Sequence, residues 1–435
     1  MKRRKFLKSV GAGVAATGLG GILAAHRAPV FAQASTVHIL RWNDFVPAAD
    51  KVLREIYVPE VQKALGIKLN VETVNANDIP ARATAGIQSG SGPDIIMLLN
   101  NYPQLYAASG VDVSDIAGDV GKAQGGIYDL PKSMCTVGGK WVAMPWATVP
   151  ALIAYRQSWF DEIGVKEFPK TWAQYHAAGK KLKAAKHAIG QTLGHTFGDA
   201  PTFAYPMMWS YGGQEVDAKG KVVLDSKETI ESVRFMTQFW KDGHDEGGLA
   251  WDDSNNNRAF LSGDICASLN GASIYVAALN GADKFKTEKG APLHTDILHA
   301  PLPAGPKGQF AYHTAFTHMV MKYSKNAKAA KEFLRWAHTP ANYEKWVVVQ
   351  KGFAVGPTRD WEKHPMWNQD PVMLPFKTAS RMGRHMGFAG APGKKAAEAW
   401  NKYIIVDMYA QAASGKMKPE ESVKWAAGEL RKIYT

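Results

Sequence analysis

The stretch Gly92-Pro-Asp-Ile-Ile-Met-Leu-Leu99 decides the fold. From Ile95 to Leu99 every side chain is apolar, and no polar position interrupts the run. A short continuous apolar run is typical of a strand that is covered on both faces in a parallel sheet. The Gly-Pro pair in front of it belongs to residues 89–93, a tight loop. The stretch therefore predicts a buried strand of an α/β lobe.

The segments on either side alternate between strand and helix patterns. Further strands are expected at residues 36–42, 67–74 and 151–155, the last following residues 141–146. The expected helices are residues 43–65, 79–88, 172–185, 227–241 and 327–337 and the helix that begins at Pro419. A capping residue or a proline marks the start of each of the last four. Gly66 fits a C-cap. This alternation predicts the α/β class.

Length and composition exclude several classes of protein. The chain has 435 residues, 46% of them hydrophobic and 21% charged, which is enough for two lobes with a large core. Such a composition excludes a disordered chain, a collagen and a disulfide-stapled miniprotein. Past the N-terminus no stretch approaches about 18 unbroken apolar residues, which excludes a polytopic membrane protein.

The first 34 residues have the pattern of an export signal. A basic start, residues 2–8, precedes a Gly-rich, weakly apolar run and the small residues Ala32-Gln-Ala34. Arg3-Arg4 indicates a twin-arginine signal. The alternatives are a membrane anchor or an ordinary first helix, and the glycines weaken both. The segment holds six of the 52 basic residues and none of the 39 acidic ones, so the rest of the chain carries only +7. In the rest of the chain the basic residues are dispersed, which argues against nucleic-acid binding.

The two cysteines are expected to be independent buried thiols. An exported protein can keep disulfides, but Cys135 and Cys266 are far apart in sequence. A bridge between them would link two different lobes and prevent their relative motion. The sequence therefore predicts no disulfide.

At this point the order of motifs resembles that of a known family. The chain resembles the extracytoplasmic solute-binding proteins of ABC importers, in particular the sugar-binding branch that includes maltose-binding protein. The motifs that carry the resemblance are Gly92-Pro-Asp-Ile-Ile96, Tyr155-Arg156, Phe160-Asp-Glu-Ile-Gly164, Pro169-Lys-Thr-Trp172, Trp209-Ser-Tyr-Gly-Gly213, Asp217-Ala-Lys-Gly220, Val222-Val-Leu-Asp-Ser226, Ala259-Phe-Leu-Ser-Gly263, Asn270-Gly271, Pro301-Leu-Pro-Ala-Gly305 and Ser324-Lys-Asn326. The family usually has Asn where this chain has Arg156.

The resemblance implies a periplasmic-binding-protein fold of the type 2 kind, in which two α/β lobes are joined by two or three crossing segments around a ligand cleft. The crossings map near residues 145–151, 301–309 and 355–359. The implied first lobe comprises residues 35–146 and 308–356, and the second comprises residues 147–307 and 357–435. Pro and Gly in the later two crossings suit hinges that absorb rotation.

A sugar site needs polar side chains that donate and accept hydrogen bonds, and aromatic planes that stack on C–H faces. Ligands of open α/β sheets lie beyond the carboxyl ends of the strands. This rule and the resemblance together imply the ligand-binding candidates Trp42, Asn43, Asp44, Asn100, Asn101, Tyr102, Trp146, Thr148, Thr202, Phe203, Tyr205, Asn270, Ser273 and Tyr275.

Several candidates have structural alternatives. Trp42, Trp146 and Phe203 could be core aromatics, Asp44 a helix cap, and Asn270-Gly271 a turn. Asn100 and Asn101 are favoured as site residues because two asparagines after a buried strand have no evident structural reason. In the family an aromatic residue often occupies the position of Ser273.

The implied function is that of a non-catalytic, monomeric periplasmic protein that binds a sugar or polyol and delivers it to the transmembrane subunits of an ABC permease. No metal or cofactor is expected. The alternatives are a polyamine or other charged solute, kept open by Asp44, and a secreted polysaccharide-degrading enzyme. For the enzyme, the tempting clusters are Asp252-Asp253 and His244-Asp-Glu246. Adjacent acids do not face each other across one bond, and both clusters are expected to be solvated loops.

Overall fold

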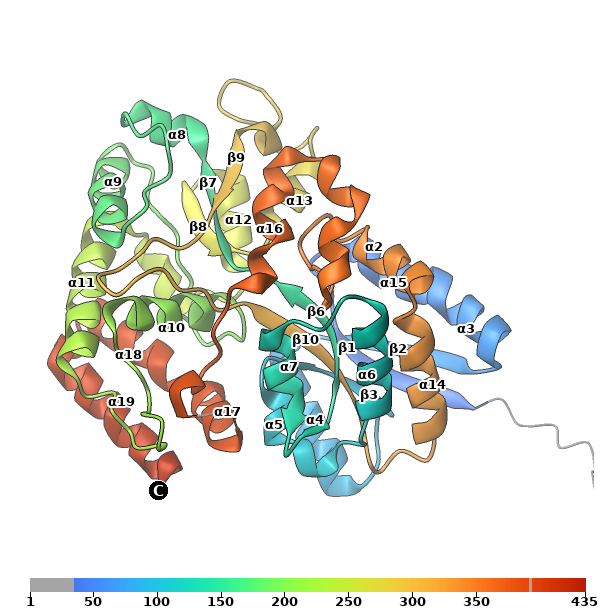
Figure 1. The fold of residues 1–435 in the computed structure, drawn as a ribbon. Coiled ribbons are helices and arrows are strands. Elements are labelled where there is room, and N and C mark those ends of the chain that lie inside the picture. The colour runs from blue at the N-terminus through green and yellow to red at the C-terminus, as the bar shows by residue number, and fades with distance from the viewer. Residues whose placement is uncertain (1–34, 391–392) are drawn as a thin grey trace, which may run out of the picture.

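The computed structural model describes residues 35–390 and 393–435, so the predicted export signal lies outside the described residues. Two separate sheets organise the chain, each within its own α/β lobe (Figure 1). The expected two-lobe α/β fold is confirmed. None of the helices in the described ranges combines the length and apolar character required to span a membrane.

The first lobe is built on a five-stranded sheet in the order β2-β1-β3-β10-β6. Its strands are β1 (Thr36–Trp42), β2 (Lys68–Val74), β3 (Ile95–Leu99), β6 (Met144–Val149) and β10 (Thr314–Val320). The predicted strand at residues 95–99 is β3, and all five of its residues are buried. It runs parallel to β1 but antiparallel to β10, because β10 returns from the other lobe. The sheet is therefore mixed rather than wholly parallel.

Helices cover both faces of the first sheet. They are α2 (Pro47–Lys51), the π-helical turn η1 (Val52–Tyr57), α3 (Val58–Leu65), α4 (Ile79–Ser89), α5 (Tyr102–Leu105), α6 (Ser114–Ala123), α7 (Asp129–Cys135), α14 (Ala327–Ala337) and α15 (Pro340–Val347). The expected helix after β1 begins at Pro47 and ends as predicted at Gly66, which has the left-handed φ of 67° that favours glycine. A small hairpin of β4 (Thr136–Val137) and β5 (Lys140–Trp141) lies beside α6.

The second lobe is built on a three-stranded antiparallel sheet in the order β8-β7-β9. Its strands are β7 (Leu152–Arg156), β8 (Ala267–Asn270) and β9 (Ile297–Ala300). The surrounding helices are α8 (Gln157–Glu162), α9 (Trp172–Ala184), α10 (Asp199–Tyr211), α11 (Lys227–Gly243), α12 (Asn255–Ser262), α13 (Ser273–Asn280), α17 (Lys394–Asn401), α18 (Ile404–Ala413) and α19 (Pro419–Tyr434). The C-terminal helices α18 and α19 pack against α11.

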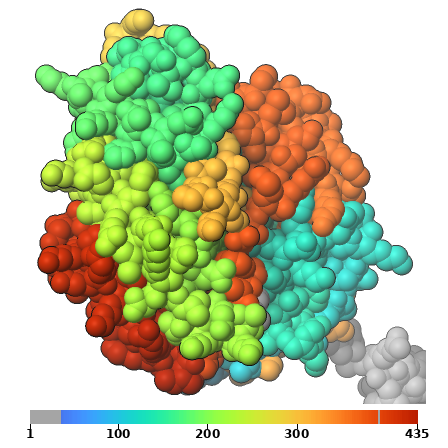
Figure 2. All heavy atoms as spheres, turned by 60° about the vertical axis from the view of Figure 1, so that its left-hand side comes forward, coloured from blue at the N-terminus to red at the C-terminus, as the bar shows by residue number. Residues whose placement is uncertain are grey.

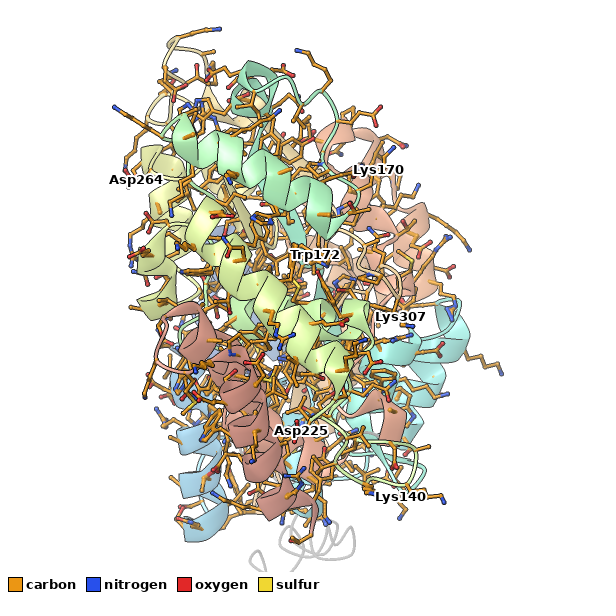
Figure 3. The ribbon with its side chains drawn as sticks, turned by 90° about the vertical axis from the view of Figure 1, so that its left-hand side faces the viewer. Lys140, Lys170, Trp172, Asp225, Asp264 and Lys307 are labelled. Atoms are coloured by element: carbon orange, nitrogen blue, oxygen red, sulfur yellow. The ribbon has the colours of Figure 1, made fainter. Side chains whose placement is uncertain are left out.

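The predicted helix starts in this lobe are confirmed by their capping bonds. The Gln174 N–H donates to Thr171 Oγ1 at 3.3 Å, and the Thr229 N–H donates to Ser226 Oγ at 3.1 Å. At the start of α9, Trp172 is buried, and its indole N–H donates to Ser210 at 3.0 Å. Figure 3 shows Trp172 lying inward, whereas the exposed Asp264 lies at the edge of the molecule.

Short turns, most of them 3-10, connect the larger elements. They are η2 (Ala76–Asp78), η3 (Ala107–Ser109), η4 (Glu246–Ala250), η5 (Leu293–Asp296), η6 (Arg359–Lys363), η7 (Pro365–Asn368), η8 (Pro371–Met373), α16 (Leu374–Lys377), η9 (Ala379–Arg381) and η10 (Phe388–Gly390). The segment from η6 to η9 contacts both lobes, since Thr358 pairs with Ile127 of the first lobe while η8 packs against β9 of the second.

Three segments cross between the lobes. The first joins β6 to β7, the second joins β9 to β10, and the third follows Val355, between α15 of the first lobe and α17 of the second. Hydrogen bonds tie the three together. Val355 exchanges two backbone bonds with Thr148, of 2.8 and 3.0 Å, and the Ala151 N–H donates to His313 Nδ1 at 3.1 Å. Burial lowers the pKa of His313 to about 4, so its ring is neutral and keeps this acceptor near neutral pH.

Both cysteines are buried free thiols, as predicted. Cys135 ends α7 of the first lobe, and Cys266 directly precedes β8 of the second. Burial raises the pKa of both thiols, which keeps them protonated and unreactive.

Candidate functional site

A small cavity lies where the two lobes meet. It has a volume of about 30 Å³, and residues of both lobes line it. The first lobe contributes Trp42, Phe45, Val149, Thr314 and Phe353, and the second contributes Phe197, Gly198, Asp199, Asp253, Asn270, Gly271 and Ser273. A second cavity of about 80 Å³ shares Trp42, Phe45, Phe197 and Asp253 and extends along Asn43 and Asp252. The two cavities are therefore parts of one interlobe site.

The first-lobe wall of the site is aromatic and consists of Trp42, Phe45 and Phe353. The Trp42 ring centroid lies 5.4 Å from that of Phe45 and 6.4 Å from that of Phe353. Phe197 of the second lobe closes the group, with its ring centroid 5.3 Å from that of Trp42. Trp42 is 2% exposed, and its indole N–H has no acceptor among the described residues. This wall can stack on an apolar face and offers one free donor.

The second-lobe wall is polar and consists of Asp199, Asp253, Asn270 and Ser273. The Asp253 carboxylate accepts hydrogen bonds from the N–H groups of Gly198 and Asp199, at 3.1 and 2.8 Å, and so caps the start of α10. The Asn256 amide donates to Asp199 Oδ2 at 2.5 Å. Burial raises the pKa of both carboxyl groups. The site therefore holds two carboxyl groups where solvent access is low.

Two side chains of this wall, Asn270 and Ser273, form a closed ring of hydrogen bonds with Asn257. Asn270 donates to Asn257 at 2.7 Å, Asn257 donates to Ser273 at 2.9 Å, and Ser273 donates to Asn270 at 2.8 Å. The ring fixes the orientation of Asn270 and Ser273, since each group has its partner within the protein.

Contacts between the lobes hold the site closed. The Asn100 amide donates to the Phe197 carbonyl at 3.4 Å, and the Tyr102 hydroxyl donates to Asn401 Oδ1 at 2.6 Å. Tyr102 also packs edge-on against Trp400, with ring centroids 5.0 Å apart. On the face shown in Figure 2, the surfaces of the two lobes meet without a wide opening. The described form is thus a closed one.

Comparison with known proteins identifies the family. Residues 42–344, more than half of the chain, match the family described as "Bacterial extracellular solute-binding protein". The chain belongs to this family.

Family relatives and solved structures agree with this assignment. A probable ABC transporter-binding protein of Deinococcus radiodurans is 25% identical over 50% of this chain, and the match spans only about half, 52%, of that relative's length. An erythritol/L-threitol-binding protein of Mycolicibacterium smegmatis is 21% identical over 75% of this chain and 71% of its own length. The maltose-bound structure of T. maritima MalE3 is 19% identical and superposes with a TM-score of 0.77, covering 92% of this chain and 100% of that one. At this identity the structural match shows the shared two-lobe fold.

Membership of the solute-binding family carries two further conclusions. Proteins of this family bind solutes outside the cytoplasm and are not enzymes. The expected family and the expected non-catalytic character are therefore confirmed.

The structure brings four of the predicted site residues to the interlobe site, namely Trp42, Asn43, Asn270 and Ser273. Asn100 lies next to it through its bond to Phe197. The local structure also explains why an asparagine stands at position 100, which the sequence analysis missed. Its φ of 51° is left-handed, a conformation that asparagine tolerates, and its Oδ1 accepts from the Ala315 N–H at 3.0 Å. Asn101 is fully buried, and neither its Oδ1 nor its Nδ2 has a partner among the described residues.

Other first-lobe candidates do not line the two cavities. Asp44 accepts from the Val46 N–H at 2.9 Å and from Gln350 at 3.0 Å, so it fits the alternative of a helix-start cap. Trp146 is buried against Tyr343, with ring centroids 4.9 Å apart. Thr148 is fully buried in β6, and Tyr102 makes the contact with α17 described above.

The remaining second-lobe candidates pack within their lobe or against the η8 segment. The Thr202 hydroxyl donates to the Gly198 carbonyl at 2.9 Å, and Phe203 packs edge-on against Trp172. Tyr205 is buried in α10, and the Tyr275 hydroxyl donates to Asp370 at 2.5 Å. Ligand contacts by these residues stay predictions.

Sequence reasoning missed much of the lining of the smaller cavity. The missed residues are Phe45, Val149, Phe197, Gly198, Asp199, Asp253, Thr314 and Phe353. The expectation that the Asp252-Asp253 cluster is a solvated loop was wrong for Asp253, which is 8% exposed because it caps α10. It was also wrong for His244, which is buried and stacked on Trp240 at 4.9 Å. The pair Gly198-Asp199 at a helix start was the one local signal that could have indicated a site.

Proposed function

We propose that this protein is the substrate-binding component of an ABC importer, that it holds a sugar or a polyol between its lobes, and that it delivers this solute to a membrane permease. The observation that carries the proposal is the interlobe site, where the aromatic first-lobe wall faces the polar second-lobe wall. A sugar or polyol offers apolar C–H faces to the former and hydroxyl groups to the latter. A maltose-bound structure of the same fold and a tetritol-binding relative support this solute class.

The small volume of the site supports a mechanism of opening and closure. Small-molecule sites usually measure about 300–1,000 Å³, whereas the cavity between the lobes measures about 30 Å³. A solute therefore enters only after the lobes have moved apart. Because a bound solute contacts both walls only when the lobes are near each other, it shifts the equilibrium toward a loaded closed form. The permease would respond to that form.

Several further features belong to the same proposal. The lobes are assigned to residues 35–146 with 308–356 and to residues 147–307 with 357–435, the protein acts as a monomer in the periplasm, and its first 34 residues direct export by the twin-arginine route. The first and second crossings lie between the two sheets, although β6 of the first-lobe sheet extends past the first of these boundaries to Val149.

A thermal-shift screen of residues 35–435 tests the proposal. The panel contains monosaccharides, oligosaccharides and polyols, and each hit is measured by calorimetry. A solute at 100 times its Kd stabilises the folded form by about 2.7 kcal/mol, which raises the Tm by a few degrees. The proposal fails if no saccharide or polyol raises the Tm, or if a polysaccharide is degraded at an enzyme-like rate.

A further inference from the structure

The two carboxyl groups of the second-lobe wall have no positive partner in the protein. Within residues 35–390 and 393–435, neither Asp199 nor Asp253 forms an ion pair with a lysine, arginine or histidine. The titratable groups that face them are Asp252 and Tyr403, and neither of these can carry a positive charge. Buried acids are normally paired with a cation or neutralised, because an isolated buried charge is costly.

At other acids with little solvent access, a nearby cation or hydrogen bonds to both oxygens stabilise the negative charge. Asp44 lies in the field of Arg41, Asp296 pairs with Arg156 at 2.5 Å, and Glu362 pairs with Arg381. Glu215 has no cation, but both of its oxygens accept hydrogen bonds, from Trp209 at 3.2 Å and from the Gly387 N–H at 2.8 Å. Glu215 also lies outside the two cavities, so among the described residues an acid pair that lacks a cation and faces a cavity is a property of the interlobe site.

The hydrogen bonds of the pair leave Asp199 facing the cavity. Both oxygens of Asp253 accept from the start of α10, and Asp199 Oδ2 accepts from Asn256. Asn270 also lies near the Asp199 carboxyl group, and the Asp199 side chain is partly accessible from the cavity that it lines. Across the cavity, the Trp42 indole N–H has no acceptor although Trp42 is 98% buried. The site thus presents an accessible carboxyl group at Asp199 and lacks an acceptor for Trp42.

The remaining walls also suit a positive charge. Trp42, Phe45, Phe197 and Phe353 present aromatic rings around the same space, and aromatic faces attract cations. A metal ion is a poor fit, because no group of three or more His, Cys, Asp or Glu side chains in the described ranges has the geometry to hold one. An organic cation would meet both the carboxyl groups and the rings.

We propose that the solute of this site carries a protonated amine as well as hydroxyl groups, as in an amino sugar or an amino polyol. The amine donates to the Asp199 carboxylate and lies in the combined field of Asp199 and Asp253. A hydroxyl oxygen of the solute accepts the Trp42 indole N–H. This inference rests on the proposed function and narrows its solute class.

Matched solutes test the inference. Calorimetry compares glucosamine with glucose and N-acetylglucosamine, and 2-amino-1,3-propanediol with glycerol, on the wild-type protein and on Asp199→Asn. We expect at least one amine to bind ten-fold or more tightly than its neutral counterpart, and the difference to vanish in Asp199→Asn. The control variant Asp264→Asn, which changes an exposed acid outside both cavities, should keep the preference.

A second measurement needs no variant. Burial raises the pKa of both acids, and a protonated amine bound beside them lowers it again. Calorimetry in buffers of different ionisation enthalpy should show proton release with the amine and none with its neutral counterpart.

The outcomes separate the two proposals. If neutral sugars or polyols bind as tightly as their amines, or if the amine preference survives in Asp199→Asn, the inference is wrong and the proposed function stands. If neither amines nor neutral solutes bind, both are wrong.

Discussion

The two walls of the interlobe site balance charge in different ways. Behind the first-lobe wall of Trp42, Phe45 and Phe353, the acid Asp44 lies in the field of Arg41 and accepts two hydrogen bonds. The second-lobe wall contains two acids without any such cation. The first wall therefore needs no charge from a solute, and it supplies shape, apolar area and the free Trp42 donor. The second is incomplete, and it specifies which chemical groups a solute must bring.

The largest effect is expected from breaking the first-lobe wall. Trp42→Ala removes a side chain that is 2% exposed and that contacts Phe45, Phe197, Phe316 and Phe353. The loss of a buried aromatic residue lowers the free energy of unfolding by about 3–5 kcal/mol. Urea unfolding measures this loss, and calorimetry should show that solute binding disappears.

Trp425→Ala on α19 is the matched control, because Trp425 is only half-buried and lies outside the site. A Trp42→Ala protein that still binds its solute within three-fold of wild type would contradict the role of this wall. Trp42→Phe separates the ring from the N–H, since it keeps the wall and loses the donor.

The second effect concerns the pH dependence of stability. Burial raises the pKa of Asp253 to about 6. An acid whose pKa is higher in the folded state contributes stability at low pH and loses it as pH rises from about 4 to about 6. A shift of two pKa units corresponds to about 3 kcal/mol. We expect Asp253→Asn to remove this decline, which urea unfolding at several pH values measures against wild type.

Asp44 provides the comparison for this experiment. Burial raises its pKa to about 6 as well, while Arg41 opposes the rise. If the solute is an amine, saturation should lower the pKa of Asp253 and leave that of Asp44 unchanged in a carboxyl NMR titration. Equal changes at both residues would argue against a charge difference between the walls.

A smaller effect is expected from loosening the contact between the lobes. Tyr102→Phe removes the 2.6 Å hydrogen bond to Asn401, which joins α5 to α17. A hydrogen bond contributes about 1 kcal/mol, so the open form of the empty protein should gain about five-fold. Small-angle scattering measures the gain as a larger radius of gyration.

Tyr106→Phe is the control for this variant. The rings of Tyr106 and Tyr102 are stacked with centroids 6.1 Å apart, but the Tyr106 hydroxyl bonds to Thr84 and to the Pro80 carbonyl within the first lobe. An equal change in scattering from both variants would show that the Tyr102 bond does not hold the lobes together.

The smallest effect is expected from removing one member of the hydrogen-bonded ring that Asn257, Asn270 and Ser273 form at the second-lobe wall. Ser273→Ala removes one donor and one acceptor of the ring with Asn257 and Asn270. We expect solute affinity to fall about three-fold, because Asn270 loses a partner that orients it, at a cost of about 0.5–1 kcal/mol. Ser262→Ala, at an exposed position, should leave affinity unchanged. A loss of more than ten-fold would mean that Ser273 contacts the solute directly.

Three strands of the first-lobe sheet, β1, β2 and β3, and the helix starts were predictable because their signals are local. The apolar run of β3, the capping residues Thr171 and Ser226 and the C-cap Gly66 each act on neighbours within a few positions of the chain. The resemblance to a family added the crossings and the cleft between the lobes.

The second-lobe wall was largely unpredictable because distant segments build it. Asp253 is buried only because it caps a helix that begins more than fifty residues earlier, at Asp199. Its local sequence is polar and resembles a solvated loop. Phe353 likewise meets Trp42 only through the third crossing. Asn100 was singled out correctly as unusual, but part of the reason is its left-handed φ of 51°.

The hydrogen bonds among the crossings have a mechanical consequence. Val355 is bonded to Thr148, and Ala151 to His313, so the three connections form one narrow ribbon instead of three independent tethers. A ribbon of this kind bends far more easily than it shears or twists apart. The two lobes should therefore rotate about a single hinge axis. One angle then describes how far apart they are, and a membrane protein can respond to that angle.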